Sequence, residues 1–365
     1  MVTAAVVEGA GAAAEAAGVT DGYRPATLTL QWHITEACNL ACSHCYQDPR
    51  RQAASLTELS DVLTQFRGLL HHFRQQAPHA TQRAHINLTG GEPFCHPQIF
   101  QLLQKVAAGH AEFSFALLSN GSYLDREATQ RLAKLKPRFV QLSIEGNAAT
   151  HDAIRGPGDH ERVCRAATNL RAAGVPVLLS FTAQRGNYRD FPEVARLGRR
   201  LGVKRVWADR FIPIGGVAEN LEKVLTPGET RDLFELMKRA QRHWNPFART
   251  EIAMHRALQF LIGDGKPYRC QAGRELITIM ANGDLVPCRR MPLVAGNLHR
   301  TSLHEIYLES PLLKQLRAPL PEEHPCQPCT YSGTCGGGLR CLGHALSGHL
   351  QQRDPGCWKE PVKGV

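Results

Sequence analysis

Short apolar or β-branched runs alternate with amphipathic segments along the first half of the chain. The runs that suit buried strands are residues 28–34, 84–88, 113–118, 139–144, 177–181 and 203–207. Segments with helical periodicity lie between them, at residues 56–73, 97–108, 126–135, 161–173 and 191–201. Gly174 and Gly202 stand where the end of a helix favours a left-handed residue. Six strand–helix units in series predict a parallel sheet, either doubly wound or curved into a partial barrel.

The pattern changes in the last third of the chain. Residues 226 to about 260 have a helical pattern, and Asn282-Gly283 then predicts a type I′ hairpin between two short apolar runs. A further helix is expected near Ser302, where Glu305 completes a capping box. Beyond Pro319 the chain is rich in Pro, Gly and Cys and poor in apolar periodicity. Burial alone would not stabilise such a segment, so a bound metal is expected to do so.

These patterns divide the chain into four parts. They are a flexible N-terminal arm at residues 1–24, a barrel at 25–225, a helical bridge at 226–265 and a small domain at 266–365. With 365 residues, 43% hydrophobic and 21% charged, the composition excludes a disordered, collagen-like or coiled-coil protein. No stretch is apolar enough to span a membrane, and the arm lacks the basic start of a signal peptide, so a cytoplasmic protein is expected. The net charge of +10 is scattered, which does not favour nucleic acid as a partner.

Twelve cysteines are too few for a disulfide scaffold in a chain of this length, and their clustering suggests metal ligands in a reducing compartment. Cys38, Cys42 and Cys45 follow the first predicted strand, at the sheet edge where α/β enzymes place their active sites. Three thiolates suit zinc or an iron–sulfur cluster and leave one coordination position open. The alternative is a structural zinc site completed by His44 or His33.

The three cysteines resemble the CX3CXΦC motif of the radical S-adenosylmethionine (radical SAM) superfamily, with His44 at the usually aromatic position. The resemblance implies a partial (β/α)6 TIM-type barrel in which these cysteines hold a [4Fe-4S] cluster that binds S-adenosylmethionine. One electron then cleaves S-adenosylmethionine to methionine and a 5′-deoxyadenosyl radical. The motif after the second strand agrees, because the family's GGEP segment receives the methionine amino group. Its residues here are Gly90, Gly91, Glu92 and Pro93.

Later strand ends also match the superfamily. Ser119 and Asn120 end the third strand, and Ser143 and Glu145 end the fourth, as in segments that contact the ribose and the carboxylate. Arg155 stands where related enzymes place an arginine near the methionine carboxylate. Each of these is also explained as a polar strand end or a helix cap. Two remaining cysteines, at positions 95 and 164, fit no ligand spacing and are interpreted as buried free thiols.

The cysteine spacing after residue 270 resembles the SPASM extension of radical SAM enzymes. The resemblance implies two auxiliary [4Fe-4S] clusters. The first is assigned Cys270, Cys288 and Cys341, and the second Cys326, Cys329, Cys335 and Cys357. The family's sixth cysteine would fall at Leu339, so Cys341 requires residues 336–338, all glycine, to loop out and Leu339 to pack outward. With three cysteines, the first cluster has one iron open to another ligand. A pair of zinc knuckles is the alternative.

The resemblance predicts oxidative modification of a ribosomally made peptide, since most SPASM enzymes act on peptides. Radical decarboxylation in heme biosynthesis is the second hypothesis. A zinc-dependent interaction module is the third, but it does not explain the GGEP strand end. Expected partners are the precursor peptide and a flavodoxin- or ferredoxin-type electron donor. The residues before the first strand are too few for a leader-binding domain, so a separate leader-binding protein is expected if the substrate carries a leader.

Asp209, at the end of the sixth strand, is the candidate acid–base group. The alternative is a salt bridge from Asp209 to Arg210.

Overall fold

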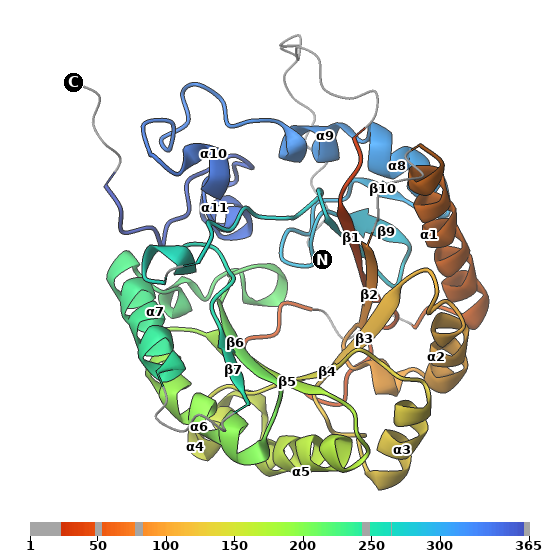
Figure 1. Ribbon diagram of the computed structural model, residues 1–365. Helices are drawn as coiled ribbons and strands as arrows, with labels where there is room; N and C mark the ends of the chain where they lie inside the picture. The colour runs from red at the N-terminus through yellow and green to blue at the C-terminus, as the bar shows by residue number, and fades with distance from the viewer. Residues whose placement is uncertain (1–22, 48–52, 77–82, 243–248, 264, 361–365) are drawn as a thin grey trace.

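Ten strands form one continuous sheet in the computed structural model, which describes residues 23–47, 53–76, 83–242, 249–263 and 265–360. The strands are β1 Thr27–His33, β2 Arg83–Thr89, β3 Ser114–Ser119, β4 Val140–Ser143, β5 Val177–Ala183, β6 Arg205–Arg210, β7 Glu251–Ala253, β8 Leu276–Ile279, β9 Asp284–Val286 and β10 Gly296–Asn297. Their order is β10-β9-β8-β1-β2-β3-β4-β5-β6-β7. Strands β1 to β7 are parallel to their neighbours and curve into a partial barrel, as predicted (Figure 1).

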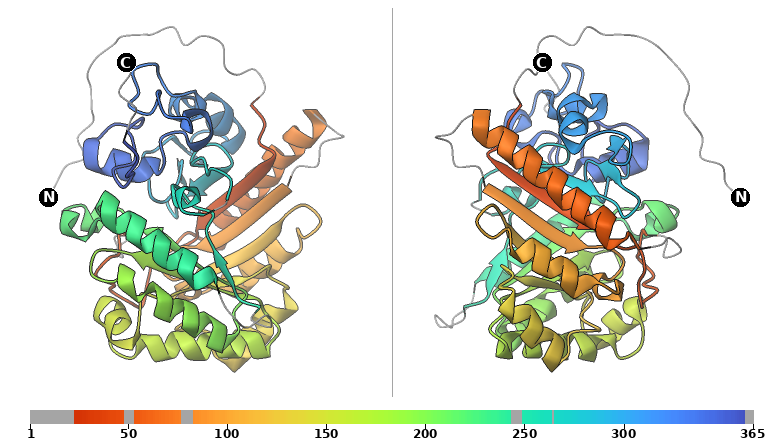
Figure 2. Two further views of the ribbon diagram at one scale, coloured as in Figure 1. Left: turned by 60° about the vertical axis from the view of Figure 1, so that its left-hand side comes forward. Right: turned by 90° about the vertical axis from the view of Figure 1, so that its right-hand side faces the viewer.

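Helices cover the outer face of this curved sheet (Figure 1). Those of the barrel are α1 Leu56–Gln76, α2 Ile99–Ala107, α3 Arg126–Lys134, α4 Ala148–Arg155, α5 Asp159–Ala172, α6 Phe191–Leu201 and α7 Pro227–Gln241. The C-terminal segment adds α8 Leu303–Glu309, α9 Pro311–Arg317, α10 Ser332–Cys335 and α11 Arg340–Ser347. Figure 2 shows this segment, in blue, seated at the side of the barrel that carries β1, with α8 packed on α1.

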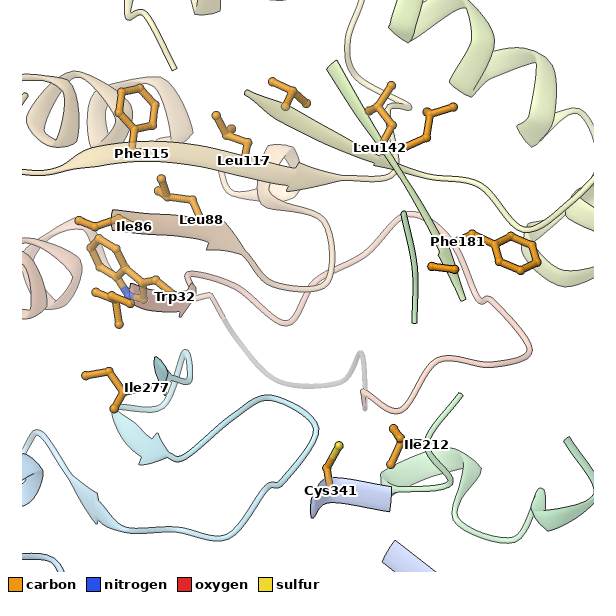
Figure 3. Close-up of a cluster of buried hydrophobic side chains, with 14 of the residues drawn as sticks. Trp32, Ile86, Leu88, Phe115, Leu117, Leu142, Phe181, Ile212, Ile277 and Cys341 are labelled. Atoms are coloured by element: carbon orange, nitrogen blue, oxygen red, sulfur yellow. The ribbon is translucent and has the colours of Figure 1, made fainter. Parts of the chain in front are cut away.

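The two faces of the barrel strands differ in chemistry. In β1, Leu30 and Trp32 are buried in the core shared with Phe66 of α1, and Figure 3 shows Trp32 and Ile86 in this core. The alternate residues of β1, including Thr29 and Gln31, point the other way and line a cavity inside the barrel. This alternation follows from the two-residue period of a strand. The apolar face therefore holds the helices, and the polar face is left for a site.

The C-terminal domain continues the barrel sheet. Leu276 of β8 pairs in parallel with Thr29 of β1, and β9 then pairs with β8 in antiparallel orientation. On the opposite edge, β7 extends the sheet beyond β6. Backbone hydrogen bonds to β1 therefore fix the hairpin between Cys270 and Cys288 beside the strand that leads to Cys38.

The helical pattern predicted for residues 226–260 is wrong in its second part. Helix α7 ends at Gln241, and Glu251–Ala253 form β7, while residues 243–248 lie outside the described structure. The exposed edge of β6 offers unpaired backbone groups, and pairing with them outweighs the local helical preference. Helix α4, which we did not predict, begins after Asn147, whose side chain accepts a hydrogen bond from the Thr150 backbone N–H at 3.0 Å.

The hairpin between β8 and β9 has a different turn from the predicted one. A type I′ turn needs positive φ at two central residues, but only Gly283 has it here, at 81°. The Met280 N–H donates to Asp284 O at 2.8 Å, and the Gly283 N–H donates to Met280 O at 3.0 Å. The connection is therefore a three-residue loop that ends in a glycine bulge.

The predicted N-terminal arm falls almost wholly on residues 1–22, which lie outside the described structure. Tyr23, which we assigned to the arm, packs against Tyr307 with ring centroids 6.3 Å apart, and Arg317 lies over its ring at 4.4 Å. The packed part of the chain therefore begins before residue 25. No helix in the described ranges is long and apolar enough to cross a membrane.

Candidate active site

The three N-terminal cysteines lie on the loop that leaves the carboxyl end of β1. Cys38, Cys42 and Cys45 all line a cavity of about 730 Å³. Two contacts hold the loop: the Ser43 N–H donates to Ile154 O at 2.9 Å, and Lys223 Nζ donates to Ser43 O at 3.0 Å. The barrel thus presents three thiols from one short loop to one open space.

The Gly90-Gly91 segment packs directly on this loop. A Cβ at Gly90 would lie 2.2 Å from Thr35 O, and one at Gly91 would lie 2.3 Å from Ala37 O. The Gly91 N–H donates to Thr35 O at 2.9 Å. Glycine is required here because only a backbone without a side chain approaches the neighbouring backbone this closely. Both glycines also line the cavity.

Glu92 is fully buried beneath the cavity wall. Its carboxylate accepts hydrogen bonds from the Asn120 backbone N–H at 2.7 Å, the Ser119 hydroxyl at 2.9 Å and the Phe94 backbone N–H at 3.2 Å. Burial raises the pKa of Glu92 to about 7, although these hydrogen bonds oppose the rise. Through these hydrogen bonds Glu92 connects the end of β2 to the end of β3. Glu92 itself does not line the cavity, whereas Ser119 and Asn120 do. Its predicted contact with the methionine amino group stays a prediction.

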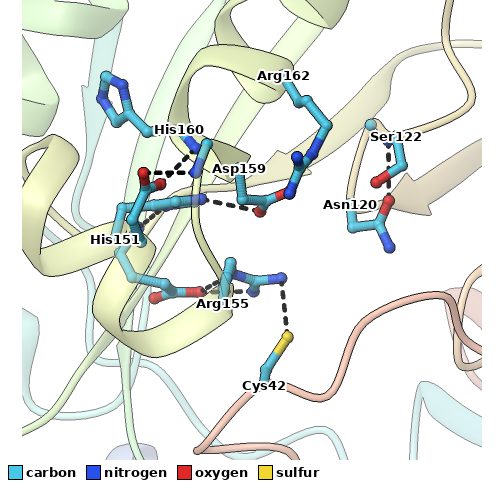
Figure 4. Close-up of polar contacts among 12 residues, drawn as sticks. Cys42, Asn120, Ser122, His151, Arg155, Asp159, His160 and Arg162 are labelled. Carbon is cyan, nitrogen blue, oxygen red and sulfur yellow. Dashed lines mark hydrogen bonds and ion pairs between the residues drawn. The ribbon is translucent and has the colours of Figure 1, made fainter.

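Buried Glu145 pairs with Arg155, which is 10% exposed, and Figure 4 shows Arg155 beside Cys42 of the cysteine loop. Arg155 Nη2 and Glu145 Oε1 are 2.6 Å apart, and His44 Nε2 lies 3.3 Å from the same oxygen. Burial alone would raise the pKa of Glu145, but Arg155 and His44 lower it to about 2. Arg155 Nη1 also donates to Cys42 Sγ at 3.8 Å. The guanidinium therefore lines the cavity and keeps a positive charge next to one of the three thiols.

A second layer of contacts orients this pair. His151 is buried on α4, accepts a hydrogen bond from the Glu145 N–H at Nδ1 over 3.0 Å, and places Nε2 3.0 Å from Asp159 Oδ2 (Figure 4). Because Nδ1 accepts, Nε2 carries the proton in the neutral ring. His151 thus fixes α4 against Glu145 and Asp159, and Arg155 at the end of the same helix is held beside Glu145.

A second cavity adjoins the main one on the side of the C-terminal domain. This second cavity, about 460 Å³, shares Leu118, Gln141, Arg289 and Arg290 with the first. The three cysteines assigned to the first auxiliary cluster also line it: Cys270, Cys288 and Cys341. Figure 3 shows Cys341 on α11 with its sulfur directed toward the barrel interior. The N-terminal thiols and the first C-terminal set therefore line two neighbouring cavities that share four residues.

The other four cysteines surround a separate small cavity of about 30 Å³. Its lining includes Cys326, Cys329, Cys335 and Cys357. Two backbone hydrogen bonds fold this region back on itself: the Cys329 N–H donates to Cys326 O at 3.0 Å, and the Cys357 N–H donates to Asp354 O at 3.0 Å. Of the seven C-terminal cysteines, four therefore line this cavity and three line the second one, and their roles as cluster ligands stay a prediction.

The glycine run before Cys341 has the backbone that the sequence predicted, but Leu339 does not pack outward. Gly336, Gly337 and Gly338 all have positive φ, at 63°, 87° and 83°. Leu339 is buried, lines the second cavity, and donates its N–H to Asp354 Oδ2 at 2.8 Å. Asp354 provides a buried acceptor at this point, so the chain turns Leu339 inward.

Asp209 lies on the wall of the second cavity and is ion-paired, but not to Arg210. Its Oδ2 is 2.5 Å from Arg290 Nη1, whereas Arg210 forms a bidentate pair with Asp354 at 2.8 and 2.6 Å. Burial alone would raise the pKa of Asp209, but Arg290, Arg256 and Arg210 lower it. A carboxylate with a lowered pKa is a weak proton acceptor, so the geometry favours the ion-pair interpretation, with Arg290 as the partner.

Sequence reasoning missed several lining residues and misjudged two thiols. Arg289 and Arg290, which line both cavities, directly follow Cys288, and their position in the cysteine motif is the only sequence signal for them. Gly215 was also missed; it follows β6, and a Cβ there would lie 2.1 Å from Tyr46 O. Cys95 and Cys164 are half-buried, and the expected full burial is wrong. They lie outside the cavity linings described above.

Comparison with protein families gives two matches. The first, to the radical SAM superfamily, covers residues 32–198, from β1 into α6. The second, to the SPASM iron–sulfur cluster-binding domain, covers residues 270–330 and begins at Cys270. The chain is a radical SAM enzyme with a SPASM domain. Both matches lie within the barrel and C-terminal parts that the sequence pattern predicted.

Among the relatives of this radical SAM/SPASM enzyme are proteins with different substrates. The AdoMet-dependent heme synthase of Nitratidesulfovibrio vulgaris is 25% identical over 358 residues, covering 92% of this chain and 94% of the relative. The mycofactocin maturase MftC of Mycobacterium tuberculosis is 27% identical over 357 residues, covering 91% and 83%. Crystalline Streptococcus suis SuiB with S-adenosylmethionine has the same fold, with a TM-score of 0.72 at 17% identity, covering 91% of this chain and 77% of SuiB.

The donor sets of the radical SAM/SPASM enzyme suit iron–sulfur clusters. A single zinc ion would draw its sulfur ligands to about 4 Å from one another. Within the described residues, no three His, Cys, Asp or Glu side chains gather closely enough to hold one metal ion. All-thiol sets around separate cavities match three [4Fe-4S] clusters, one with S-adenosylmethionine at the N-terminal loop and two auxiliary. When bound, the first cluster supplies the electron that cleaves S-adenosylmethionine to a 5′-deoxyadenosyl radical.

Replacing Cys341 with alanine should disturb only the auxiliary cluster that we assign to Cys270 and Cys288. Its thiol faces the second cavity, whereas the four-cysteine set surrounds a different one. Loss of a thiolate affects cluster potential and solvent exposure locally. We expect one altered cluster signal in electron paramagnetic resonance, unchanged 5′-deoxyadenosine formation and less product. Unchanged spectra and iron content would show that Cys341 is not a ligand.

Proposed function

We propose that this enzyme oxidatively modifies a ribosomally made peptide, forming a side-chain cross-link or another oxidised product. The observation that carries the proposal is that the cavity at the radical-forming loop adjoins the cavity at the first auxiliary cysteines, with four lining residues in common. Gln141 and Leu118 line both cavities. A substrate side chain bound beside them would lie between the 5′-deoxyadenosyl radical, which removes a hydrogen atom, and the first auxiliary cluster, which can accept an electron. Oxidative cross-linking removes one hydrogen atom, one further electron and one proton from the peptide: the hydrogen atom goes to the 5′-deoxyadenosyl radical, the electron to the auxiliary cluster and the proton to solvent.

Relatives support a peptide substrate. The mycofactocin maturase matches nearly the whole chain, and SuiB, which shares the fold, has been crystallised with its precursor peptide SuiA. Under this proposal, Arg155 and Asn120 bind S-adenosylmethionine, since both side chains face the cavity that the three thiols line. Glu92 accepts a hydrogen bond from the backbone N–H of Asn120, and Glu145 pairs with Arg155, so the two carboxylates position these residues.

Decarboxylation of a porphyrin propionate is the second candidate. The heme synthases favour it, because the alignment covers 94% of the N. vulgaris protein. The arginines on the cavity walls also suit propionates as well as acidic peptides. This function would use the same radical and the same cavity.

One experiment separates the two functions. The anaerobically reconstituted enzyme is incubated with S-adenosylmethionine and dithionite, either with each short peptide encoded beside its gene or with iron coproporphyrin III, and the products are read by mass spectrometry. We expect a peptide that has lost two hydrogen atoms, with no such product from the Cys42→Ala control. A porphyrin that has lost carbon dioxide, with every peptide unchanged, would contradict the peptide proposal and establish the second function.

We further propose that a flavodoxin or ferredoxin supplies the electron and that a separate protein binds the leader of the peptide. The twelve thiols suit a reducing compartment, which supports a cytoplasmic location.

A further inference from the structure

The charged side chains on the walls of the two adjoining cavities are almost all paired. Four arginines pair with carboxylates at 2.5 to 2.8 Å: Arg155 with Glu145, Arg210 with Asp354, Arg290 with Asp209 and Arg205 with Glu251. A fifth, Arg256, stacks over Trp207 at 4.4 Å and lies 3.9 Å from Asp209. Each of these five charges therefore already has a carboxylate partner within the protein.

Arg289 is different. It forms no hydrogen bond or ion pair with any residue in the described part of the chain, and it lines both cavities. Burial lowers the pKa of His33 to about 3, and the charge of Arg289 contributes to this shift. Arg289 shares the first cavity with the cysteine loop and the second with Cys270, Cys288 and Cys341. Its guanidinium has no carboxylate partner among the described residues.

The one unpaired carboxylate of the second cavity belongs to Glu275, at the start of β8, where Leu276 is in register with Thr29 of β1. Glu275 forms no ion pair with Arg289. Among the described residues no carboxylate therefore pairs with Arg289, and its N–H groups are available to an anion from outside the protein.

We propose that Arg289 binds a carboxylate of the substrate and thereby fixes the substrate between the two cavities. The inference rests on the proposed radical SAM/SPASM function and deepens it by naming the substrate class. A planar guanidinium with free N–H groups suits a carboxylate, which it binds through two parallel hydrogen bonds. Both a peptide carboxylate and a porphyrin propionate supply this group, so the chemistry is common to the two candidate substrates.

The test measures binding to the reconstituted enzyme under anaerobic conditions by isothermal titration calorimetry. The probes are coproporphyrin III and the peptides encoded beside the gene, each as the free acid and as the methyl ester. For at least one free acid, Arg289→Gln should raise Kd about ten- to a hundredfold, the loss expected for a charge-assisted hydrogen bond. The ester of that probe should bind the wild type and the variant equally weakly. Arg289→Lys should recover part of the affinity, because it keeps the charge but not the planar pair of donors.

Arg231→Gln is the matched control. It removes the same charge from an exposed ion pair with Glu235 on α7, outside both cavities, and should leave every Kd unchanged. Iron content and the KM for S-adenosylmethionine should not change in Arg289→Gln. An increase in that KM with unchanged probe Kd would assign Arg289 to S-adenosylmethionine and overturn the inference, as would a wild type that binds neither free acid.

The two probes also separate this inference from the proposed function. Loss of affinity for the peptide acid supports both. Loss of affinity for the porphyrin acid alone supports the role of Arg289 and contradicts the peptide proposal.

Discussion

Replacing Cys42 with alanine should abolish formation of 5′-deoxyadenosine. Cys42 lies between Cys38 and Cys45 on the loop after β1, and Arg155 Nη1 donates to its sulfur at 3.8 Å. Two thiolates are too few to hold the first cluster, so the group that delivers the electron would be lost. The seven C-terminal cysteines line different walls, and their clusters should persist. Iron should therefore fall from about twelve to about eight atoms per chain.

The measurement is 5′-deoxyadenosine by liquid chromatography with S-adenosylmethionine and dithionite, together with iron analysis and electron paramagnetic resonance of the same sample. Cys95→Ala is the matched control, because this half-buried thiol lies outside all three cysteine-lined cavities. It should keep both the activity and the iron. Persistent cleavage in Cys42→Ala would contradict the assignment of the catalytic loop.

Replacing Asp354 with asparagine should destabilise the protein by about 3–5 kcal/mol, the usual cost of leaving one member of a buried ion pair without its partner. Asp354 in the SPASM domain and Arg210 at the end of β6 are 0% and 2% exposed, and their closest atoms are 2.6 Å apart. The substitution removes the charge that neutralises Arg210. It also weakens the acceptor for the Leu339 and Gly356 N–H groups, at 2.8 and 2.9 Å.

Thermal unfolding followed by circular dichroism, with the clusters kept reduced and intact, measures this effect as a lower midpoint temperature. Glu235→Gln is the control. It breaks an exposed ion pair with Arg231, where such pairs contribute about 0–1 kcal/mol, so its midpoint should stay close to that of the wild type. A midpoint for Asp354→Asn equal to that of the control would show that the Arg210 pair does not join the two parts of the protein.

Most strands and helices of the barrel were predictable because they have a clear local signal. Strand β5 is rich in apolar residues and is buried along most of its length, and Gly202 ends α6 with φ of 60°. Strand β7 had no such signal. It is three residues long and exists because the edge of β6 supplies backbone partners. The local sequence of β7 does not indicate that its pairing partner, β6, lies 46 residues earlier in the chain.

The candidate site divides in the same way. Short spacing grouped only Cys38, Cys42 and Cys45, whereas the assignment of the seven later cysteines to two sets came from the resemblance to the SPASM family. The roles of the charged residues depended on the tertiary structure. Asp209 pairs with Arg290 and Arg210 pairs with Asp354, although Asp209 and Arg210 are adjacent in sequence. Neighbouring residues of a strand point to opposite faces, so adjacency in sequence is a poor guide to ion pairing.

The sequence by itself determined the chemistry available to this protein: three thiols after the first strand, a glycine pair before a glutamate, and seven further thiols at SPASM spacing. The first two are short-range patterns, whose members chain geometry keeps close together, and the third was interpreted through the family resemblance. The tertiary structure alone decided that the two parts share one sheet through β1 and β8, and that Arg289 lines the cavities of both. It also left Arg289 without a partner among the described residues. That outcome depends on where every nearby carboxylate comes to lie, because charges pair through space and not along the chain.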